Sequence, residues 1–235
     1  MGGNQMATFF PNVLDKFLSS AFLEGVRKKY HYEETQASEF RVVAEEMLPL
    51  MREEAFWERR VSLGKNKHQS EECNMIHEQV VMSLGNGVDR LQEKYSERGL
   101  LSQSYMIEVM ASELLLQGYV AYNYYIKENT DWHVARYHFL GSEENYPLEM
   151  MPDLLRELTP LITCNSAFCM LPKKSVAFIA ELTQDDKVQC RGICVGCNNL
   201  NCSNRMEDGG LIQKRLSVMT DLPLTYGYRR IFGLI

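Results

Sequence analysis

The hydrophobic positions in the first sixty residues recur at helical spacing. Residues 8–29 predict an amphipathic helix, because their apolar side chains fall on one face and Pro11 fits the first turn. A second helix is predicted over residues 37–60, with a kink or break at Pro49, because proline removes a backbone hydrogen bond. We expect the charged faces of both helices to be solvated. The chain therefore begins with a helical segment.

The middle of the chain changes from alternating to helical periodicity. Val80, Met82 and Leu84 alternate with their neighbours, which predicts a short strand ending at the Gly-Asn-Gly sequence 85–87. Helices are predicted over residues 87–98 and 103–127, where apolar residues again recur every three or four positions.

Short apolar runs separated by proline follow. Residues 133–139 predict a strand and residues 147–158 a helix that has Pro152 near its start. Residues 161–171 and 175–182 predict two paired strands joined by Pro-Lys-Lys. On these strands, Cys164 and Cys169 are expected to be packed thiols, which behave as small apolar groups.

Helices and strands mix without regular βαβ alternation, which predicts an α+β fold with a mixed or antiparallel sheet and flanking helices. A length of 235 residues suits one medium domain or two small ones. We expect a helical N-terminal extension over residues 1–70 and a main domain over residues 71–235.

Composition narrows the classes of partner. A net charge of −6 argues against nucleic acid, because no basic patch offsets phosphate repulsion. No apolar run approaches the length of a membrane span, and the first residues lack the basic and apolar regions of a signal peptide. Seven cysteines without such a signal indicate a reducing, cytoplasmic location.

The densest chemical motif is a run of four cysteines, Cys190, Cys194, Cys197 and Cys202, at the spacing C-x3-C-x2-C-x4-C. Thiolates are soft ligands, so the run predicts a metal centre, either an iron–sulfur cluster of the [4Fe–4S] type or zinc. Thiols without metal, or thiols joined in disulfides, remain the alternative. The first three cysteines also resemble the radical-SAM motif, but only 33 residues follow Cys202, too few for that family's barrel.

Several stretches, taken in order, resemble a known family. They are VVMSLGNGVDRLQEKYSERG, MIEVMASELL, NYPLEMMPDLL, CMLPKKSVAFIAEL and CRGICVGCNNLNCSNR. The chain resembles the reactivation domain of cobalamin-dependent methionine synthase, which binds S-adenosylmethionine (AdoMet), and more closely its stand-alone, cysteine-bearing relatives. The resemblance covers about residues 75–205.

The resemblance implies an accessory role in cobalamin-dependent methyl transfer. In the family, the domain holds AdoMet against a partner's cobalamin, and one electron plus the methyl group of AdoMet returns oxidised Co(II) to methylcobalamin. A cysteine-ligated iron–sulfur cluster suits this role because such clusters reach low potentials. The implied partners are a corrinoid-binding methyltransferase protein and an electron donor.

The resemblance also implies binding residues for AdoMet. The family's loop reads Arg-x-x-x-Gly-Tyr followed by Pro-Leu-Glu. Here Arg136 and Gly141 stand one residue further apart, Ser142 replaces the tyrosine, and the Pro-Leu-Glu sequence at 147–149 matches. Arg136 would pair with the ligand's carboxylate and Gly141 would allow close backbone approach. Glu113 matches an acidic helix position that would face the sulfonium or amino group. The alternative for Glu113 is a solvated helix glutamate.

Other chemistry has less support in the sequence. Asp131-x-His133 lacks the glycine of the cobalamin-binding motif, because Arg136 stands in its place, so cobalamin is expected on a partner. The five histidines show no metal-ligand spacing, and none is predicted as a ligand. The second functional hypothesis is a non-catalytic interaction module whose four cysteines hold a structural zinc.

Overall fold

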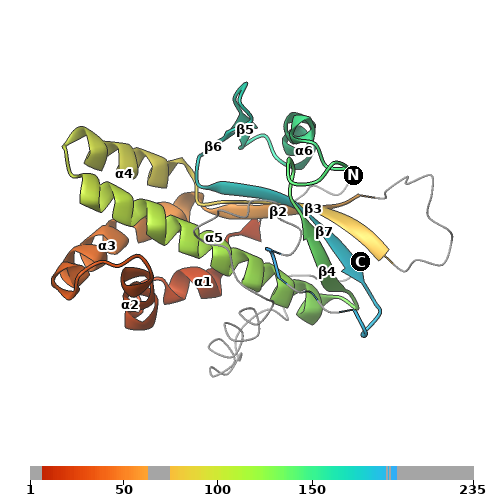
Figure 1. Cartoon of the computed structure of the whole chain (residues 1–235), viewed down its shortest axis with the longest axis horizontal. Helices are drawn as coiled ribbons and strands as arrows, with labels where there is room; N and C mark the ends of the chain where they lie inside the picture. Colours follow the sequence, from red (N-terminus) through yellow and green to blue (C-terminus); the bar gives the residue numbers. More distant parts are fainter. Residues whose placement is uncertain (1–6, 63–74, 189, 191, 195–235) are drawn as a thin grey trace.

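A five-stranded antiparallel sheet lies between a large helical layer and a smaller one (Figure 1). The computed structural model describes residues 7–62, 75–188, 190 and 192–194. In chain order, the elements are β1 (Ala7–Thr8), α1 (Pro11–Lys16), α2 (Ser20–Lys29), the 3-10 helix η1 (Glu34–Gln36), α3 (Ala37–Glu54), β2 (Phe56–Ser62), β3 (Met75–Ser83), α4 (Asn86–Glu97), α5 (Leu101–Asn129), β4 (His133–His138), the 3-10 helix η2 (Leu148–Met150), α6 (Met151–Leu158), β5 (Thr163–Cys164), β6 (Met170–Leu171) and β7 (Ser175–Thr183). The predicted α+β class is confirmed.

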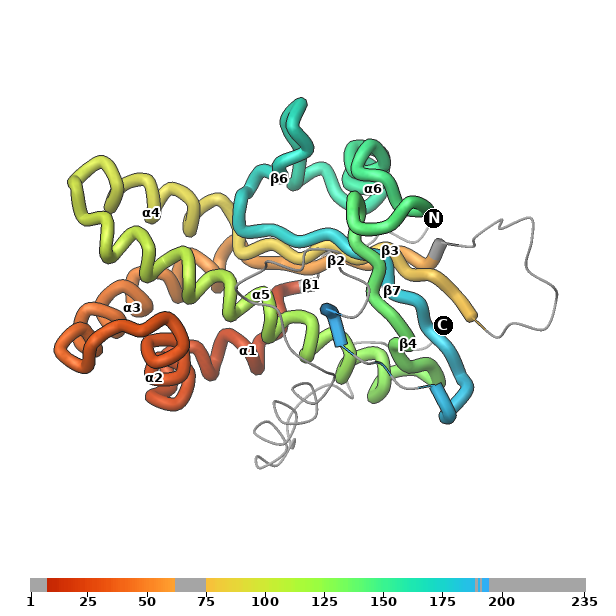
Figure 2. Tube along the Cα trace, viewed as in Figure 1, coloured from red at the N-terminus to blue at the C-terminus, as the bar shows by residue number. Residues whose placement is uncertain are grey.

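The order of strands in the sheet is β1-β2-β3-β7-β4, with every neighbouring pair antiparallel. The last strand, β7, therefore runs between β3 and β4 (Figure 2). In the β3–β7 register, His77 lies opposite Glu181 at one end, and Ser83 lies opposite Ser175 at the other. This register brings residues a hundred positions apart in sequence onto neighbouring strands.

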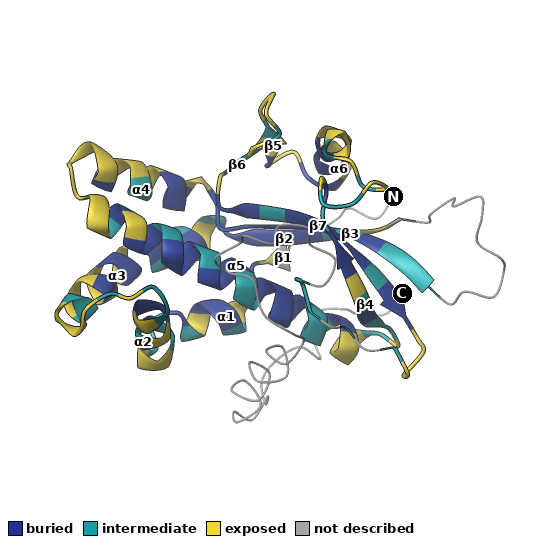
Figure 3. Ribbon diagram, in the orientation of Figure 1, coloured by how far each residue is buried: buried dark blue, intermediate teal, exposed yellow. Residues whose placement is uncertain are grey.

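The main core lies between the sheet and the large helical layer. Helix α5 runs along this face of the sheet, and residues at alternate strand positions point towards it, among them Val80, Met82 and Phe178. Tyr137 of β4 joins the same core. Exposed positions gather on the outward faces of the helices, while most of the sheet is buried (Figure 3).

A second, smaller core covers the opposite face of the sheet. Leu154, Leu155 and Leu158 of α6 pack against strand residues such as Val81 and Ile179. These strand residues alternate with those of the main core, so both faces of the central strands are buried. Helix α6 thus defines the side of the sheet on which the polar cluster described below lies.

The single helix predicted over residues 8–29 is wrong in part. The chain forms the two-residue strand β1, then the separate helices α1 and α2. Ser19 starts the second helix, because its Oγ accepts a hydrogen bond of 3.2 Å from the amide of Phe22. A serine N-cap satisfies a backbone donor that would otherwise lack a partner, and this favours a new helix start over continuation.

The helix predicted over residues 37–60 ends earlier than expected, and Pro49 does not break it. Helix α3 is continuous to Glu54, with Pro49 on its exposed side. The carbonyl of Glu45, left without its usual donor, can be hydrated there. Residues 56–62 form strand β2, because Phe56 and Trp57 are buried on opposite faces of the sheet.

The pairing predicted for residues 161–171 with residues 175–182 is also wrong. Strands β5 and β6 pair with each other as a two-stranded hairpin, whereas β7 enters the main sheet. Cys164 is half-buried on β5, but Cys169 is exposed and lies before β6. The strands predicted near residues 80–84 and 133–139 and the helices predicted at 87–98, 103–127 and 147–158 are confirmed, with shifted ends.

The predicted domain boundary at residue 70 lies outside the described residues. On its two sides, β2 pairs with β3 over seven residue pairs. Residues from both segments share the main core, for example Trp57 and Phe178.

Candidate functional site

Strand β4 and the turn after it carry two of the residues predicted to bind AdoMet. The register of β4 against β7 shifts between Val134 and Arg136, which marks a bulge. Beyond the bulge, Tyr137 points into the main core, so its neighbours Arg136 and His138 face the α6 side. About half of the Arg136 side chain is exposed.

The turn after β4 folds back over that strand. Gly141 has φ +81°, and its amide donates a hydrogen bond of 2.7 Å to the carbonyl of Tyr146. A Cβ atom at Gly141 would approach the Leu148 side chain to 3.3 Å. The positive φ and this close approach account for glycine here, and its amide is already used within the turn.

The turn places Glu143 beside two cations of β4. A carboxylate oxygen of Glu143 accepts a hydrogen bond of 3.2 Å from Nη2 of Arg136. The other oxygen lies 3.0 Å from Nδ1 of His138. Of the predicted AdoMet residues, Arg136 therefore belongs to a small polar network, and Gly141 lies in the turn that positions Glu143 of that network.

His138 lies between two carboxyl groups and is only 5% exposed. Its Nε2 is 3.2 Å from Glu181 of β7, and the Nε2 of His77, on β3, is 3.7 Å from the same oxygen. A neutral imidazole has a single N–H and can donate to only one carboxylate. To interact favourably with both, His138 needs a proton or another cation bound at its second ring nitrogen.

The charges of this cluster shift its pKa values in opposite directions. Burial alone would lower the pKa of His138, but hydrogen bonds to Glu181 and Glu143 outweigh it and raise that pKa. Hydrogen bonds from His138 and then His77 lower the pKa of Glu181 to about 2, against the effect of burial. The cluster therefore holds Glu181 as a carboxylate.

Sequence reasoning missed His77, His138 and Glu181 as a group. They lie on three different strands, and no local spacing connects them. Only the register of β3 and β4 against β7 brings them together. A correct prediction that β7 pairs with both β3 and β4 would have brought these three residues together.

Glu113 lies in a different place from Arg136. It is buried on α5, at 7% exposure, and its carboxylate is 2.5 Å from Nζ of Lys29 on α2. Helix α5 covers the main-core face of the sheet, whereas Arg136 faces the α6 side. The structure thus places Glu113 and Arg136 on opposite sides of the sheet.

The start of the cysteine run lies against the main core. Cys190 is half-buried among core residues, and burial raises the pKa of its thiol against an opposing hydrogen bond from the backbone of Gly192. Burial, and then the neighbouring Cys190 and Tyr119, raise the pKa of Tyr137 well above its ordinary value.

The segment leading to the cysteines is also tied to β4. The ring Nε2 of His133 is within 2.9 Å of the carbonyl of Val188. Cys194 is half-buried, while Cys197 and Cys202 lie outside the described residues. The two described thiols supply the donor type that an iron–sulfur cluster or zinc requires.

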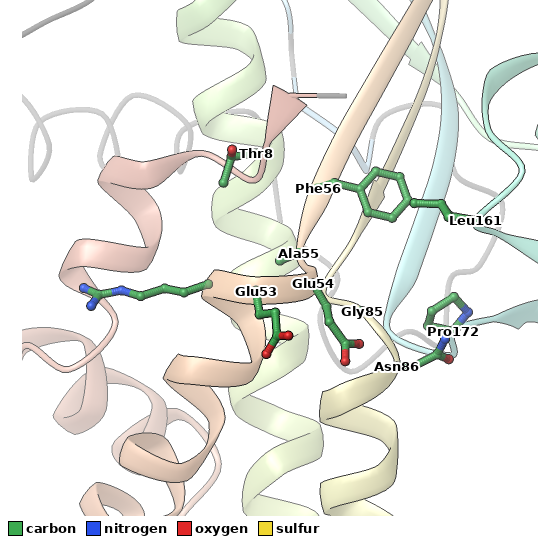
Figure 4. Close-up of a pocket in the computed structure, with 10 residues that line it drawn as sticks. Thr8, Glu53, Glu54, Ala55, Phe56, Gly85, Asn86, Leu161 and Pro172 are labelled. Atoms are coloured by element: carbon green, nitrogen blue, oxygen red, sulfur yellow. The ribbon is translucent and has the colours of Figure 1, made fainter. Parts of the chain in front are cut away.

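A cavity of about 350 Å³ lies elsewhere, where α3 meets β2. Phe56, Leu161, Glu54 and Gly85 are among the residues that line it (Figure 4). Because Gly85 follows the far end of β3, this cavity lies at the opposite end of the strand from His77. Of the predicted site residues that the structure describes, none lines it.

A scan against protein-family models finds no matching family, and a search of curated proteins finds no matching relative. Within the part of the chain that the structure describes, no helix has both the length and the apolar character needed to cross a membrane.

Proposed function

We propose that this protein is an accessory component of cobalamin-dependent methyl transfer that reductively reactivates a partner's corrinoid. In this proposal it binds AdoMet and an iron–sulfur cluster held by Cys190, Cys194, Cys197 and Cys202. AdoMet supplies the methyl group, and an external donor supplies the electron through the cluster. The corrinoid belongs to a methyltransferase partner, and the protein works in the cytoplasm.

The arrangement around β4 is the observation that carries the proposal. Cys190, the first cysteine of the run, packs against the main core to which Tyr137 of β4 belongs. His133 of the same strand lies 2.9 Å from the carbonyl of Val188, two residues before Cys190, and Arg136 immediately precedes Tyr137. A source of electrons and a group that binds a carboxylate would therefore lie on the two opposite faces of one short strand. Positioning of this kind is the protein's main contribution when cofactors supply the chemistry.

Arg136 is the described residue best suited to contact AdoMet. Its guanidinium is half-exposed and makes one hydrogen bond to Glu143, which leaves further N–H donors for a ligand carboxylate. Gly141 would shape the turn, because its own amide is bonded to Tyr146. Glu113, paired with Lys29, would help to hold α5 in place, away from the AdoMet residues Arg136 and Gly141.

Calorimetric titration of the anaerobically purified full-length protein with AdoMet tests this proposal. We expect saturable binding, and Arg136→Gln is expected to weaken it roughly tenfold, the effect of losing one charge-assisted hydrogen bond. Arg156→Gln is the matched control, because Arg156 is an exposed arginine on α6 that pairs within its own helix. Absence of AdoMet binding, or equal affinity in both variants, would contradict the assignment.

A further inference from the structure

Three side chains that can bind a metal meet on the α6 side of the sheet. His77 of β3, Glu181 of β7 and His138 of β4 come from three neighbouring strands. His77 and Glu181 are directly opposite in the register, and His138 lies two residues beyond the partner of Glu181 on β4. Side chains in such positions on one face of a sheet are close neighbours. Three adjacent strands are a rigid support for a ligand set.

The spacing of their ligand atoms fits a single ion. Oε2 of Glu181 is 3.2 Å from Nε2 of His138 and 3.7 Å from Nε2 of His77, and all three atoms lie within 4.8 Å of one another. Bonds of about 2.0–2.2 Å to one ion hold such ligand atoms roughly 3.0–3.6 Å apart. Small side-chain rotations would therefore complete the site.

The groups behind His138 orient it as a metal ligand. Glu143 lies 3.0 Å from Nδ1, and Arg136 in turn donates a hydrogen bond of 3.2 Å to Glu143. A carboxylate that accepts from Nδ1–H fixes the ring orientation and directs the Nε2 lone pair away from itself, here towards His77 and Glu181. The ring of Tyr146 packs against His138 at 4.7 Å between centroids.

The partial exposure of two of these side chains leaves room for a further ligand. The side chain of His138 is 7% exposed, but those of His77 and Glu181 are 15% and 21% exposed. Three protein ligands with an accessible side resemble the open metal sites that bind water or substrate, whereas closed structural sites use four.

We propose that His77, His138 and Glu181 bind a divalent transition-metal ion through two imidazole nitrogens and one carboxylate. This ligand set suits zinc, iron(II), cobalt(II) or manganese(II). Magnesium and calcium prefer oxygen ligands alone, and copper(I) prefers sulfur. The site shares no ligand with the cysteine run, so its test is independent of the proposed function.

Cobalt(II) titration separates this site from the cysteines. The probe is added to metal-free full-length protein and to the variant with Cys190, Cys194, Cys197 and Cys202 all changed to serine. Cobalt bound by thiolates gives strong charge-transfer absorption in the near ultraviolet, whereas cobalt bound by nitrogen and oxygen gives only weak visible bands. We expect the serine variant to bind one cobalt ion with the second type of spectrum.

Variants then assign the ligands in the serine background. His77→Ala and Glu181→Gln are expected to weaken cobalt binding at least tenfold, whereas His31→Ala, at an exposed histidine outside the cluster, leaves it unchanged. Glu143→Gln is expected to weaken cobalt binding roughly 10- to 100-fold, because Glu143 orients the ring of His138. Glu144→Gln, at the exposed neighbouring residue, is expected to have no effect.

Circular dichroism of each variant confirms that it is folded. If the serine variant does not fold, the nitrogen–oxygen component of the wild-type cobalt spectrum is followed in the same His77 and Glu181 variants. The proposal is overturned if folded protein binds cobalt only through thiolates. It is also overturned if His77→Ala and Glu181→Gln bind cobalt as tightly as His31→Ala does.

Discussion

The Nε2 atom of His138 lies 3.2 Å from a carboxylate oxygen of Glu181, which joins the end strand β4 to its neighbour β7. Much of the sheet surface facing α6 is apolar, yet this end carries a cluster of charged groups. On the other face of the same strand, Tyr137 belongs to the core against which Cys190 packs. The chemistry that we propose for this protein is therefore concentrated around β4.

A second charged group is buried on the main-core side of the sheet, and its removal gives a test of the fold. Glu78 is 1% exposed, and it accepts hydrogen bonds of 2.6 Å from the hydroxyl of Tyr122 and 2.8 Å from Arg59. Tyr122→Phe deletes one of these donors in a site that water cannot readily reach. We expect the free energy of unfolding, measured with urea, to fall by about 1–3 kcal/mol.

Tyr124→Phe is the matched control for Tyr122→Phe. Tyr124 lies on the same helix but is half-buried. Its hydroxyl is expected to contribute less than about 0.5 kcal/mol, as at surface positions. Equal losses in the two variants would show that the hydrogen bond to Glu78 adds no particular stability.

The dependence of stability on pH is tested at Glu58 of β2. Burial raises the pKa of this carboxyl group, against an opposing hydrogen bond with Thr159. The folded protein therefore holds this proton more tightly than the unfolded chain does. The contribution of Glu58 to stability falls as pH rises from its ordinary pKa of 4.5 to the raised value. Above the raised value, the full penalty for burying the ionised carboxylate applies.

Glu58→Gln removes this penalty. We expect a gain in the free energy of unfolding at pH 7 that disappears below pH 4.5, because Glu58 is then protonated in both states. Urea denaturation at several pH values measures the difference. The exposed Glu53→Gln serves as the matched control. A gain that is the same at all pH values would contradict burial of an ionised group as the cause.

Alanine substitutions at two glycines with positive φ compare the stability cost of backbone strain alone with the cost of strain plus a steric clash. Gly85, before α4, has φ +84° and ψ +168°, and a Cβ atom there would lie 2.4 Å from Cβ of Glu54. Gly99 has φ +75°, and an added Cβ would meet no atom within 4 Å. Gly99→Ala is expected to cost about 1–2 kcal/mol, the ordinary penalty of left-handed backbone.

Gly85→Ala is expected to cost clearly more than Gly99→Ala, because the junction of α3 and β2 must also shift. Thermal and urea unfolding of the two variants side by side measure the difference. Equal costs would indicate that the Glu54 side chain moves aside without loss.

Local periodicity predicted much of the secondary structure. The helices near residues 87–98 and 103–127 and the strand near 80–84 were recognisable because their apolar residues keep one period over many positions. Residues 56–60 were not, because Glu58, Arg59 and Arg60 obscure the alternation, and the segment directly follows a helix. Its burial depends on Phe56 and Trp57 facing two different cores.

Pairing between distant segments was not predictable in the same way. The position of β7 between β3 and β4 is decided by long-range packing, and no neighbouring residue signals it. Both the wrong partner for residues 175–182 and the missed cluster of His77, His138 and Glu181 follow from this. The cysteine run was recognisable because its four members are close in sequence.

The proposal depends most on what Cys190, Cys194, Cys197 and Cys202 bind. The decisive measurement is the iron, zinc and acid-labile sulfide content of anaerobically purified full-length protein, together with its visible absorption before and after dithionite. The proposed role predicts about four iron and four sulfide per chain and a broad brown absorption that dithionite bleaches. A colourless protein with one zinc per chain would contradict it and would indicate a structural metal instead.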